Sequence, residues 1–160
     1  MSEIIIIYDS YFGNTQKIAE AMAQAIPEGM KFSLRKAGEV SLEDLKDMST
    51  LIVGSPTRQF KATAAIDGFL KQMPKGRLNG VKVAAFDTRM TPEDVNQNKF
   101  LSLMVKLFGY AAEKIAKKLS NLGGVEAISP QGFYVNGVEG PLLDGELERA
   151  ADWVKQAISG

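Results

Sequence analysis

Small polar and flexible residues near the amino terminus form the first group that could bind a ligand. Ser10, Gly13, Asn14 and Thr15 follow a run of isoleucines and precede a segment with helical periodicity. The first N–H groups of a helix lack carbonyl partners and lie at the positive end of its dipole, so they can bind a phosphate. Hydroxyl and amide side chains add donors. Because residues 8–16 contain no Lys or Arg, a phosphate here would be held by neutral donors.

The chain lacks the residues on which several kinds of chemistry depend. It contains no Cys and no His. Their absence excludes disulfides, thiolate nucleophiles, Ser-His-Asp triads and most zinc or haem sites. We therefore expect neither a catalytic side chain nor a metal site. A redox function would have to come from a bound organic cofactor.

An alternation of strands and helices positions these polar residues. Residues 4–7 are four consecutive isoleucines, typical of a strand buried on both faces of a parallel sheet. The remaining pattern predicts strands at 31–36, 50–54 and 81–86, and a fifth that starts near Val125, is interrupted at Pro130 and resumes over 132–135. Helices are predicted around residues 18–26, 41–47, 66–73 and 115–122, and from about Gly145 to the end.

Strands separated by helices favour parallel pairing with right-handed crossovers. The two-sided apolar first strand and the edge-like second favour the order 2-1-3-4-5. We therefore predict an α/β fold, with a doubly wound five-stranded parallel sheet in a three-layer α/β/α sandwich. Ligands bind beyond the carboxyl ends of such strands, so the loops after strands 1, 3 and 4 should form one site.

Length and charge narrow the possibilities further. A chain of 160 residues fits a single domain over residues 1–160. Lys plus Arg and Asp plus Glu both number 19, so the net charge is zero and no nucleic-acid partner is indicated. No apolar run approaches the length of a membrane span and no signal peptide is evident, so we expect a cytoplasmic protein.

The run Ile-Ile-Tyr-x-Ser-x-x-Gly-x-Thr-x-x-x-Ala over residues 6–19 resembles the flavodoxin signature for the FMN phosphate. The resemblance implies a flavodoxin-like fold, FMN as cofactor and redox proteins as partners. The sequence departs from the pattern at Met22, where Ile, Leu or Val is preferred. The residues implied in phosphate binding are Ser10, Tyr11, Phe12, Gly13, Asn14 and Thr15, with two aromatic residues where flavodoxins usually carry hydroxyls.

Residues 54–60, Gly-Ser-Pro-Thr-Arg-Gln-Phe, resemble the flavin-ring loop of flavodoxin-like proteins, most closely that of NAD(P)H:quinone reductases with this fold. A flavin ring needs a flat aromatic partner and N–H donors for its polar edge. Phe60 either stacks on the ring or packs on the following helix. The ring-binding residues implied are Pro56, Thr57, Arg58, Gln59 and Phe60.

This loop contains no glycine between residues 56 and 62. A residue with a side chain pays about 1 kcal/mol to adopt a left-handed backbone conformation. We therefore expect the loop to turn a carbonyl group toward the ring less readily than a glycine-containing loop.

The loop after the fourth strand should form the other wall, through Asp87, Thr88, Arg89 and Met90. Short-chain flavodoxins commonly supply a Tyr at this wall, and this chain offers Arg89 and Met90 instead. An arginine about 6 Å from the ring, at an effective dielectric constant near 20, would stabilise negative charge on it by roughly 3 kcal/mol. Arg58 and Arg89 are the candidates.

Residues 98–108 are unusually apolar. We favour a helix buried against the sheet. The alternatives are a flap over the flavin or a surface patch for self-association or a partner.

Other families of this fold class fit less well. Ser55 and Pro56 stand where a receiver domain needs its phosphoacceptor Asp, and a small tyrosine phosphatase needs a Cys. Neither Gly-Lys-Ser/Thr nor Gly-x-Gly-x-x-Gly occurs.

Three functions remain open. The first is an FMN-binding electron carrier that shuttles electrons between redox partners. The second is an FMN-dependent oxidoreductase acting on NAD(P)H and quinone. The third is an interaction module without cofactor, suggested by Tyr11, Phe12 and the absent wall Tyr.

Overall fold

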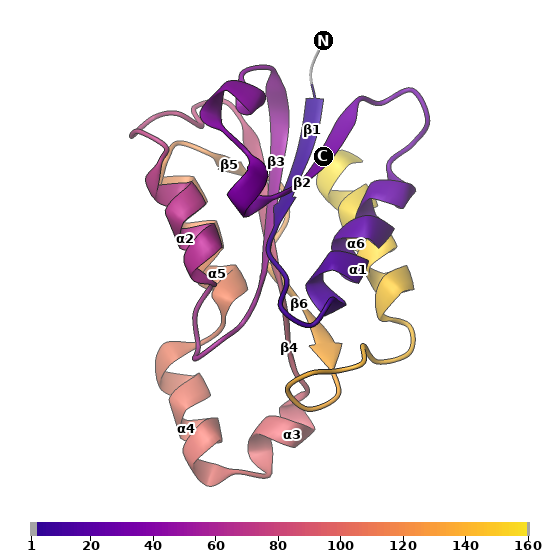
Figure 1. Cartoon of the computed structure of the whole chain (residues 1–160), viewed down its shortest axis with the longest axis vertical. Helices are drawn as coiled ribbons and strands as arrows, with labels where there is room; N and C mark the ends of the chain where they lie inside the picture. The colour runs from indigo at the N-terminus through magenta and orange to yellow at the C-terminus, as the bar shows by residue number, and fades with distance from the viewer. Residues whose placement is uncertain (1–2, 160) are drawn as a thin grey trace.

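The computed structural model describes residues 3–159 and has three layers, with one sheet between two layers of helices (Figure 1). The elements are β1 (Glu3–Tyr8), α1 (Asn14–Ala25), β2 (Phe32–Lys36), the 3₁₀ turns η1 (Ala37–Glu39) and η2 (Leu42–Leu45), β3 (Met48–Pro56), α2 (Ala64–Lys71), β4 (Lys82–Met90), α3 (Pro92–Asn96), α4 (Lys99–Phe108), α5 (Ala111–Asn121), β5 (Val125–Glu126), β6 (Gln131–Val135) and α6 (Glu146–Ser159).

The sheet is parallel throughout and has the order β2-β1-β3-β4-β5, with β6 also paired to β4. This confirms the predicted order. The predicted interruption of the last strand is also present, because β5 pairs with Lys82 and Val83 whereas β6 pairs with Phe86–Met90. Pro130 lies between the two pieces, where a residue without an N–H donor is tolerated.

Strands β3 and β4 run further than predicted. Asp87, Thr88, Arg89 and Met90, expected in a loop, belong to β4 and pair with β6. Pro56 belongs to β3 and pairs with Thr88. The polar side chains concealed these strand ends, because a strand of low hydrophobicity reads as a loop unless its neighbour is known.

The helix predicted at 41–47 is the 3₁₀ turn Leu42–Leu45. Its expected start is confirmed: Ser41 and Asp44 form a capping box, in which the Asp44 carboxylate accepts the Ser41 N–H at 2.9 Å.

The isoleucines of β1 divide between two cores, as a strand buried on both faces requires. Ile5 and Ile7 face α2 and α5, whereas Ile4 and Ile6 face α1 and α6 (Figure 1). Trp153 belongs to the second core, with its ring centroid 6.1 Å from that of Phe86 in an edge-to-face arrangement. It therefore packs the core, as the sequence indicated.

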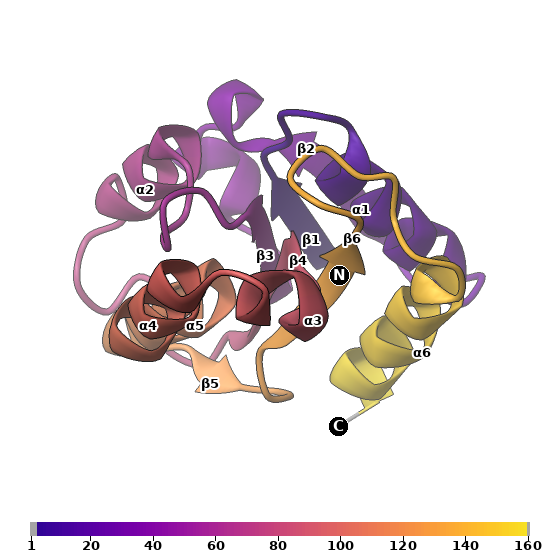
Figure 2. The same ribbon diagram turned by 90° about the horizontal axis from the view of Figure 1, so that it is seen from below.

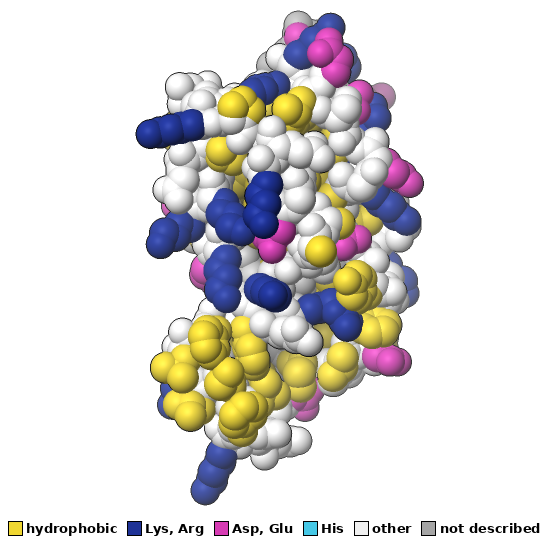
Figure 3. Space-filling model, turned by 60° about the vertical axis from the view of Figure 1, so that its left-hand side comes forward, with side chains coloured by type: hydrophobic (Ala, Val, Ile, Leu, Met, Phe, Trp, Pro, Cys, Tyr) yellow, Lys and Arg dark blue, Asp and Glu magenta, His cyan; other side chains and the backbone are white. Residues whose placement is uncertain are grey.

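The prediction that residues 98–108 are buried against the sheet is wrong. None of the residues of α4 is buried. The helix lies past the carboxyl ends of the strands (Figure 1) and overlaps α5 when the molecule is seen from that end (Figure 2). The apolar residues of α4 instead divide between two surfaces. One side of the helix lines a cavity, and another is exposed to solvent (Figure 3). Within residues 3–159, no helix combines the length and apolar character needed to cross a bilayer.

Candidate functional site

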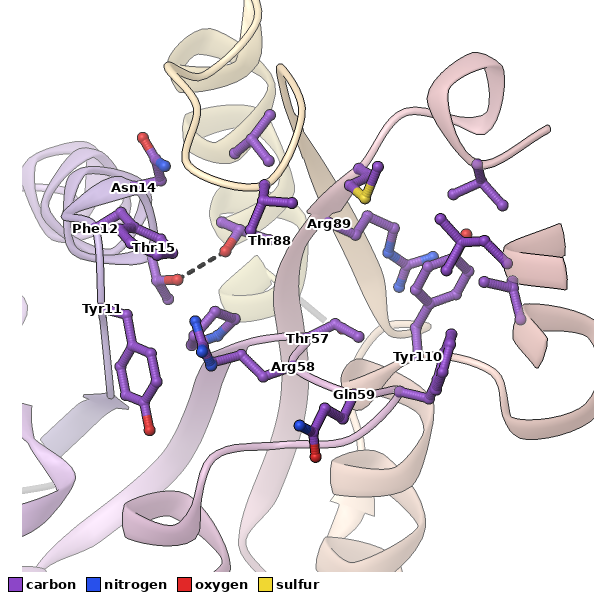
Figure 4. A pocket seen from close by; sticks show the side chains of 18 residues that line it. Tyr11, Phe12, Asn14, Thr15, Thr57, Arg58, Gln59, Thr88, Arg89 and Tyr110 are labelled. Atoms are coloured by element: carbon purple, nitrogen blue, oxygen red, sulfur yellow. Dashed lines mark hydrogen bonds between the residues drawn. The ribbon is translucent and has the colours of Figure 1, made fainter. Parts of the chain in front are cut away.

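A cavity of about 370 Å³ opens at the carboxyl ends of β1, β3 and β4 (Figure 4). This is the place that the sheet order predicts for a ligand. Its lining residues are Tyr11, Phe12, Asn14, Thr15, Pro56, Thr57, Arg58, Gln59, Phe60, Thr88, Arg89, Met90, Val95, Leu101, Val105, Tyr110, Val135 and Val138.

The structure brings together nearly all the residues selected from the sequence. Ser10, Gly13 and Asp87 are the ones that do not line the cavity. Ser10 and Gly13 shape the start of α1, and Asp87 lies behind the wall, where it holds Arg89. These three residues therefore hold the lining residues in position without contacting the cavity themselves.

The amino-terminal end of α1 forms one end of the cavity. Gly13 precedes the helix with φ of 90°, a left-handed conformation that glycine adopts at little cost. As a glycine, it offers no side chain of its own to cap the helix. The hydroxyl of Ser10 accepts the N–H of Gly13 at 3.1 Å and that of Gln16 at 3.4 Å. The N–H groups of Asn14 and Thr15 have no carbonyl partner within the helix, and its first turn holds no acidic side chain.

The side chains of Asn14 and Thr15 bind neighbouring segments. Asn14 donates through Nδ2 to the carbonyl of Glu139 at 2.8 Å, and a Cβ at Gly140 would lie 2.5 Å from that nitrogen. Thr15 and Thr88 share a hydrogen bond of 2.7 Å between their buried hydroxyls (Figure 4). These two contacts hold the first turn of α1 from two sides. They use only side-chain atoms of Asn14 and Thr15, so the backbone N–H groups of these two residues remain available to a ligand.

The loop after β3 is a two-residue turn closed by Arg58 and Lys61. The N–H of Arg58 donates to the carbonyl of Lys61 at 2.9 Å, and the reverse bond is 3.1 Å. The central residues Gln59 and Phe60 have φ of 50° and 66°, the signature of a type I′ turn, which normally prefers Asn-Gly. The absence of glycine therefore does not keep this loop out of the left-handed region, although each such residue costs about 1 kcal/mol.

Contacts from later in the chain hold this turn in place. Lys114 donates through Nζ to the carbonyl of Phe60, and the Phe60 ring centroid lies 6.1 Å from that of Phe108. Phe60 thus contacts the end of α4, an arrangement that neither of the two sequence-based alternatives described.

Arg58 bridges two loops at the mouth of the cavity. Its guanidinium carbon lies 4.1 Å from the ring centroid of Tyr11 and 5.7 Å from that of Phe12, within the range of a cation–π contact. Figure 4 shows the Arg58 and Tyr11 side chains facing one another. The turn has two basic residues, Arg58 and Lys61. Of these, Arg58 lies beside the aromatic residues of the first loop.

Arg89 is held at the other end of the cavity by a buried carboxylate. Its Nε and one terminal nitrogen donate to the two oxygens of Asp87 at 2.7 and 2.8 Å. The N–H of Ala112 also donates to Asp87, at 2.9 Å. On its other side, the guanidinium lies 3.8 Å from the ring centroid of Tyr110, and Gly132 leaves space for it, since a Cβ there would lie 2.0 Å from Nε.

Burial and the Asp87–Arg89 pairing act in opposite directions on the ionisation of this cluster. Burial raises the pKa of Asp87, more than hydrogen bonding to Arg89 lowers it. Burial also acts to lower the pKa of Arg89, but the hydrogen bonds and charge of Asp87 prevail and raise it. Burial likewise raises the pKa of the Tyr110 hydroxyl. Arg89 consequently remains a fixed cation beside an un-ionised phenol.

Sequence reasoning missed six lining residues. Tyr110 supplies an aromatic ring on the side where the loop after the fourth strand has none. Leu101 and Val105 are four positions apart and share one face of α4. The alternative in which residues 98–108 form a flap over the ligand could have identified them from this spacing. The others, Val95, Val135 and Val138, carry no sequence signal that separates them from ordinary core residues.

Comparisons with known proteins agree with this geometry. A family model described as "Flavodoxin domain" matches residues 5–130. A flavodoxin of Aquifex aeolicus is 28% identical over 100% of this chain and 91% of its own. An NAD(P)H dehydrogenase (quinone) of Cupriavidus metallidurans is 24% identical over 77% of this chain and 74% of its own. The solved structure of oxidised Flavodoxin 1 from Bacillus cereus has the same fold, with a TM-score of 0.76 at 18% identity over 99% and 98% of the two chains.

Proposed function

The chain belongs to the flavodoxin family, and we propose that it binds FMN in the cavity beyond β1, β3 and β4 and transfers electrons between redox partners. The observation that carries the proposal is the neutral start of α1, where backbone N–H groups lie at one end of a cavity that is otherwise largely apolar. FMN accepts and releases electrons when bound, chemistry that the side chains of this protein do not supply.

The residues of the cavity fit the two unlike ends of this cofactor. The first turn of α1 offers N–H donors and the positive end of the helix dipole, which suit a phosphate dianion. Figure 4 shows Arg89 and Tyr110 at the opposite end from Asn14 and Thr15. An aromatic ring and a cation at that end suit a flat, electron-accepting ring.

Each group of residues has a distinct task in this proposal. The backbone around Asn14 and Thr15 binds the phosphate, and Ser10 holds the turn in shape. Tyr110 and Arg89 contact the ring from one wall. Leu101 and Val105 cover the apolar end and exclude water from it, which strengthens the electrostatic interactions inside.

An FMN-dependent NAD(P)H oxidoreductase of the quinone type is the second candidate. The wall formed by α3 and α4 favours it, because Val95, Leu101 and Val105 extend the apolar lining of the cavity, and an apolar acceptor needs such a surface. A relative is also named for that activity. NAD(P)H oxidation by the FMN-loaded protein alone, accelerated by a soluble quinone, would support this candidate over the carrier.

Titration with FMN and with riboflavin tests the common part of both candidates. FMN should bind much more tightly than riboflavin, which lacks the phosphate. Thr15→Asp adds a negative charge at the start of α1, where about 4 kcal/mol of repulsion corresponds to a loss of FMN affinity of roughly 1000-fold. Riboflavin affinity should change by less than about threefold.

Asn121→Asp is the matched control. It adds the same charge at an exposed position at the end of α5, and should leave both affinities unchanged. Circular dichroism would check that Thr15→Asp folds, because Thr15 is buried and hydrogen-bonded to Thr88. Equal affinities of the wild-type protein for FMN and riboflavin would contradict the proposed phosphate site at the start of α1. No binding at micromolar FMN would contradict the proposal as a whole and favour an interaction module.

A further inference from the structure

Helix α4 presents a second apolar face, directed away from the cavity. Phe100, Leu103 and Leu107 are 68%, 53% and 65% exposed, and none of the residues of this helix is buried. Figure 3 shows hydrophobic side chains gathered at this end of the molecule, with Lys and Arg side chains nearby. We call Lys99, Phe100, Leu103, Lys106 and Leu107 the outer face of α4.

The spacing along the helix separates the two faces. Residues 100, 103 and 107 are three and four positions apart, so their side chains share one side of the helix. Leu101 and Val105 lie on another side and line the cavity. The residues of the outer face do not line the cavity. Substitutions on the outer face should therefore leave the cavity unchanged.

The charge around the outer face is positive although the net charge of the chain is zero. Helices α4 and α5 together contain one acidic residue, Glu113, and the lysines 99, 106, 114, 117 and 118. Among the described ion pairs, Lys118 binds Asp67 at 2.9 Å, and none involves Lys99, Lys106 or Lys117. The acidic residues of α3 are Glu93 and Asp94, and Asp94 accepts the N–H of Gly137 at 3.1 Å.

We propose that the outer face of α4 docks on an anionic lipid bilayer. Helices with exposed Phe and Leu flanked by Lys lie in the interface, with the apolar side chains among the acyl chains and the lysines at the headgroups. The excess of lysines complements a negative lipid surface.

Two other occupants fit the outer face less well. A protein partner typically exchanges both donors and acceptors across its interface, but the side chains of this face offer only cationic donors and no acceptor. A second copy of the chain would bring two sets of lysines together, and juxtaposed like charges are unfavourable.

Docking in this way would bring the apolar end of the cavity close to the bilayer. Because α4 contributes to both surfaces, an apolar electron acceptor dissolved in the lipid would reach the cavity along this helix. This last step rests on the proposed function, whereas docking itself requires no cofactor.

Sedimentation with vesicles tests the docking, using both the apo-protein and the FMN-loaded protein. Vesicles of phosphatidylcholine with about 30% phosphatidylglycerol should bind the protein, and pure phosphatidylcholine vesicles should bind it at least tenfold more weakly. Lys99→Gln and Lys106→Gln should each weaken binding about fivefold. Leu103→Ser combined with Leu107→Ser should weaken it more than tenfold.

Val125→Ser is the matched control, because Val125 is 57% exposed but lies in β5, away from α4. Its vesicle binding should equal that of the wild type. Absence of binding to anionic vesicles, or binding that the α4 variants leave unchanged, would overturn the proposal. A dimer in sedimentation velocity that Leu103→Ser/Leu107→Ser dissociates would assign the face to a second copy and overturn it too.

The two proposals fail separately. Apo-protein that binds anionic vesicles but never takes up FMN would leave the docking intact and remove the proposed function. Protein that binds FMN tightly but no vesicles would do the reverse.

Discussion

Two arginine–carboxylate pairs flank β6 and have nearly the same geometry. Arg89 contacts both oxygens of Asp87 at 2.7 and 2.8 Å, and Arg149 contacts both oxygens of Glu146 at 2.9 and 2.6 Å. Each carboxylate also accepts a backbone N–H, and each guanidinium lies over an aromatic ring. Both approach Gly132, whose carbonyl accepts a hydrogen bond from Arg149.

The pairs differ in burial. The side chains of Asp87 and Arg89 are 0% and 12% exposed, whereas those of Glu146 and Arg149 are 8% and 36% exposed. Burial raises the pKa of Asp87. For Glu146, burial is outweighed by the hydrogen bonds from Arg149 and the Tyr134 N–H, which hold its pKa below the usual range. The hydrogen bonds lower the pKa of both carboxyl groups, and the net shifts have opposite signs because desolvation outweighs these bonds only at Asp87.

The pairs also differ in what they support. Arg89 lines the cavity and Asp87 fixes its position. Arg149 and Glu146 do not line the cavity, and they attach the start of α6 to β6. Asp87 therefore positions the Arg89 guanidinium at the cavity. The Glu146–Arg149 pair stabilises the fold, so it can serve as a control for substitutions in the first pair.

The largest difference should appear when each carboxylate is neutralised. Asp87→Asn replaces one of the two oxygens that accept hydrogen bonds from Arg89 with an N–H₂ donor, and it leaves Glu113, 3.5 Å away, as the remaining carboxylate paired with Arg89. The buried donors that lose their acceptor should reduce the free energy of unfolding by about 3 kcal/mol. Glu146→Gln should cost about 1–2 kcal/mol, because Arg149 can be hydrated. Urea denaturation measures both values.

Asp67→Asn, which removes an exposed partner of Lys118, is the control and should cost under about 1 kcal/mol. Equal losses for Asp87→Asn and Glu146→Gln would mean that burial does not distinguish the two pairs. Riboflavin and FMN affinity should fall in Asp87→Asn only.

A smaller effect is expected at Gly132, between the pairs. A Cβ there would lie 2.0 Å from Arg89 Nε, so Gly132→Ala should displace this guanidinium at a cost of about 2 kcal/mol. In the background of Arg89→Ala the same substitution should cost less than half as much, which a double-mutant cycle measures. Gly38→Ala, with no atom within 4 Å of its added Cβ, should have little effect on stability.

The smallest effect is a change in pH dependence. Since the pKa of Glu146 is lowered on folding, its ionisation stabilises the fold above the unfolded pKa of about 4.3, and this contribution is lost as the pH falls through the folded value. Glu146→Gln should flatten stability between about pH 5 and pH 3.

Asp87 should behave in the opposite sense. Its pKa is raised, so its ionisation favours the unfolded chain and its contribution to stability falls as the pH rises through the folded pKa. Denaturation midpoints measured from about pH 3 to neutral pH for the wild-type protein, Glu146→Gln and Asp87→Asn would reveal the two signs. Slopes of the same sign would show that the two carboxylates share one environment.

The parts of the site that are contiguous in sequence could be predicted. The isoleucines of β1 and the residues from Ser10 to Thr15 define a strand, a turn and a helix start within a single run, because these structures depend on local propensity and backbone geometry. The sheet order followed from the alternation of elements and is confirmed.

The parts assembled from distant segments could not. Tyr110 reaches the cavity only because α3 and α4 intervene between β4 and α5, and no local pattern encodes where such a pair of helices lies. The apolar residues of α4 indicated burial, yet they divide between the cavity and solvent. Gln59 and Phe60 adopt a left-handed backbone conformation that their residue types disfavour. Contacts of Phe60 with Lys114 and Phe108, far along the chain, stabilise this turn.

The extension of β4 to Met90 has a consequence for the time scales of ligand exchange. Residues Phe86–Met90 are bonded into the ladder through β6, and the earlier part of this stretch through β3 as well, so their amides should exchange with solvent only when the sheet itself opens. The turn at 58–61 and helix α4 have no such ladder and should exchange through fast local fluctuations. A ligand would then enter and leave by movement of the turn and the helix against a stationary strand.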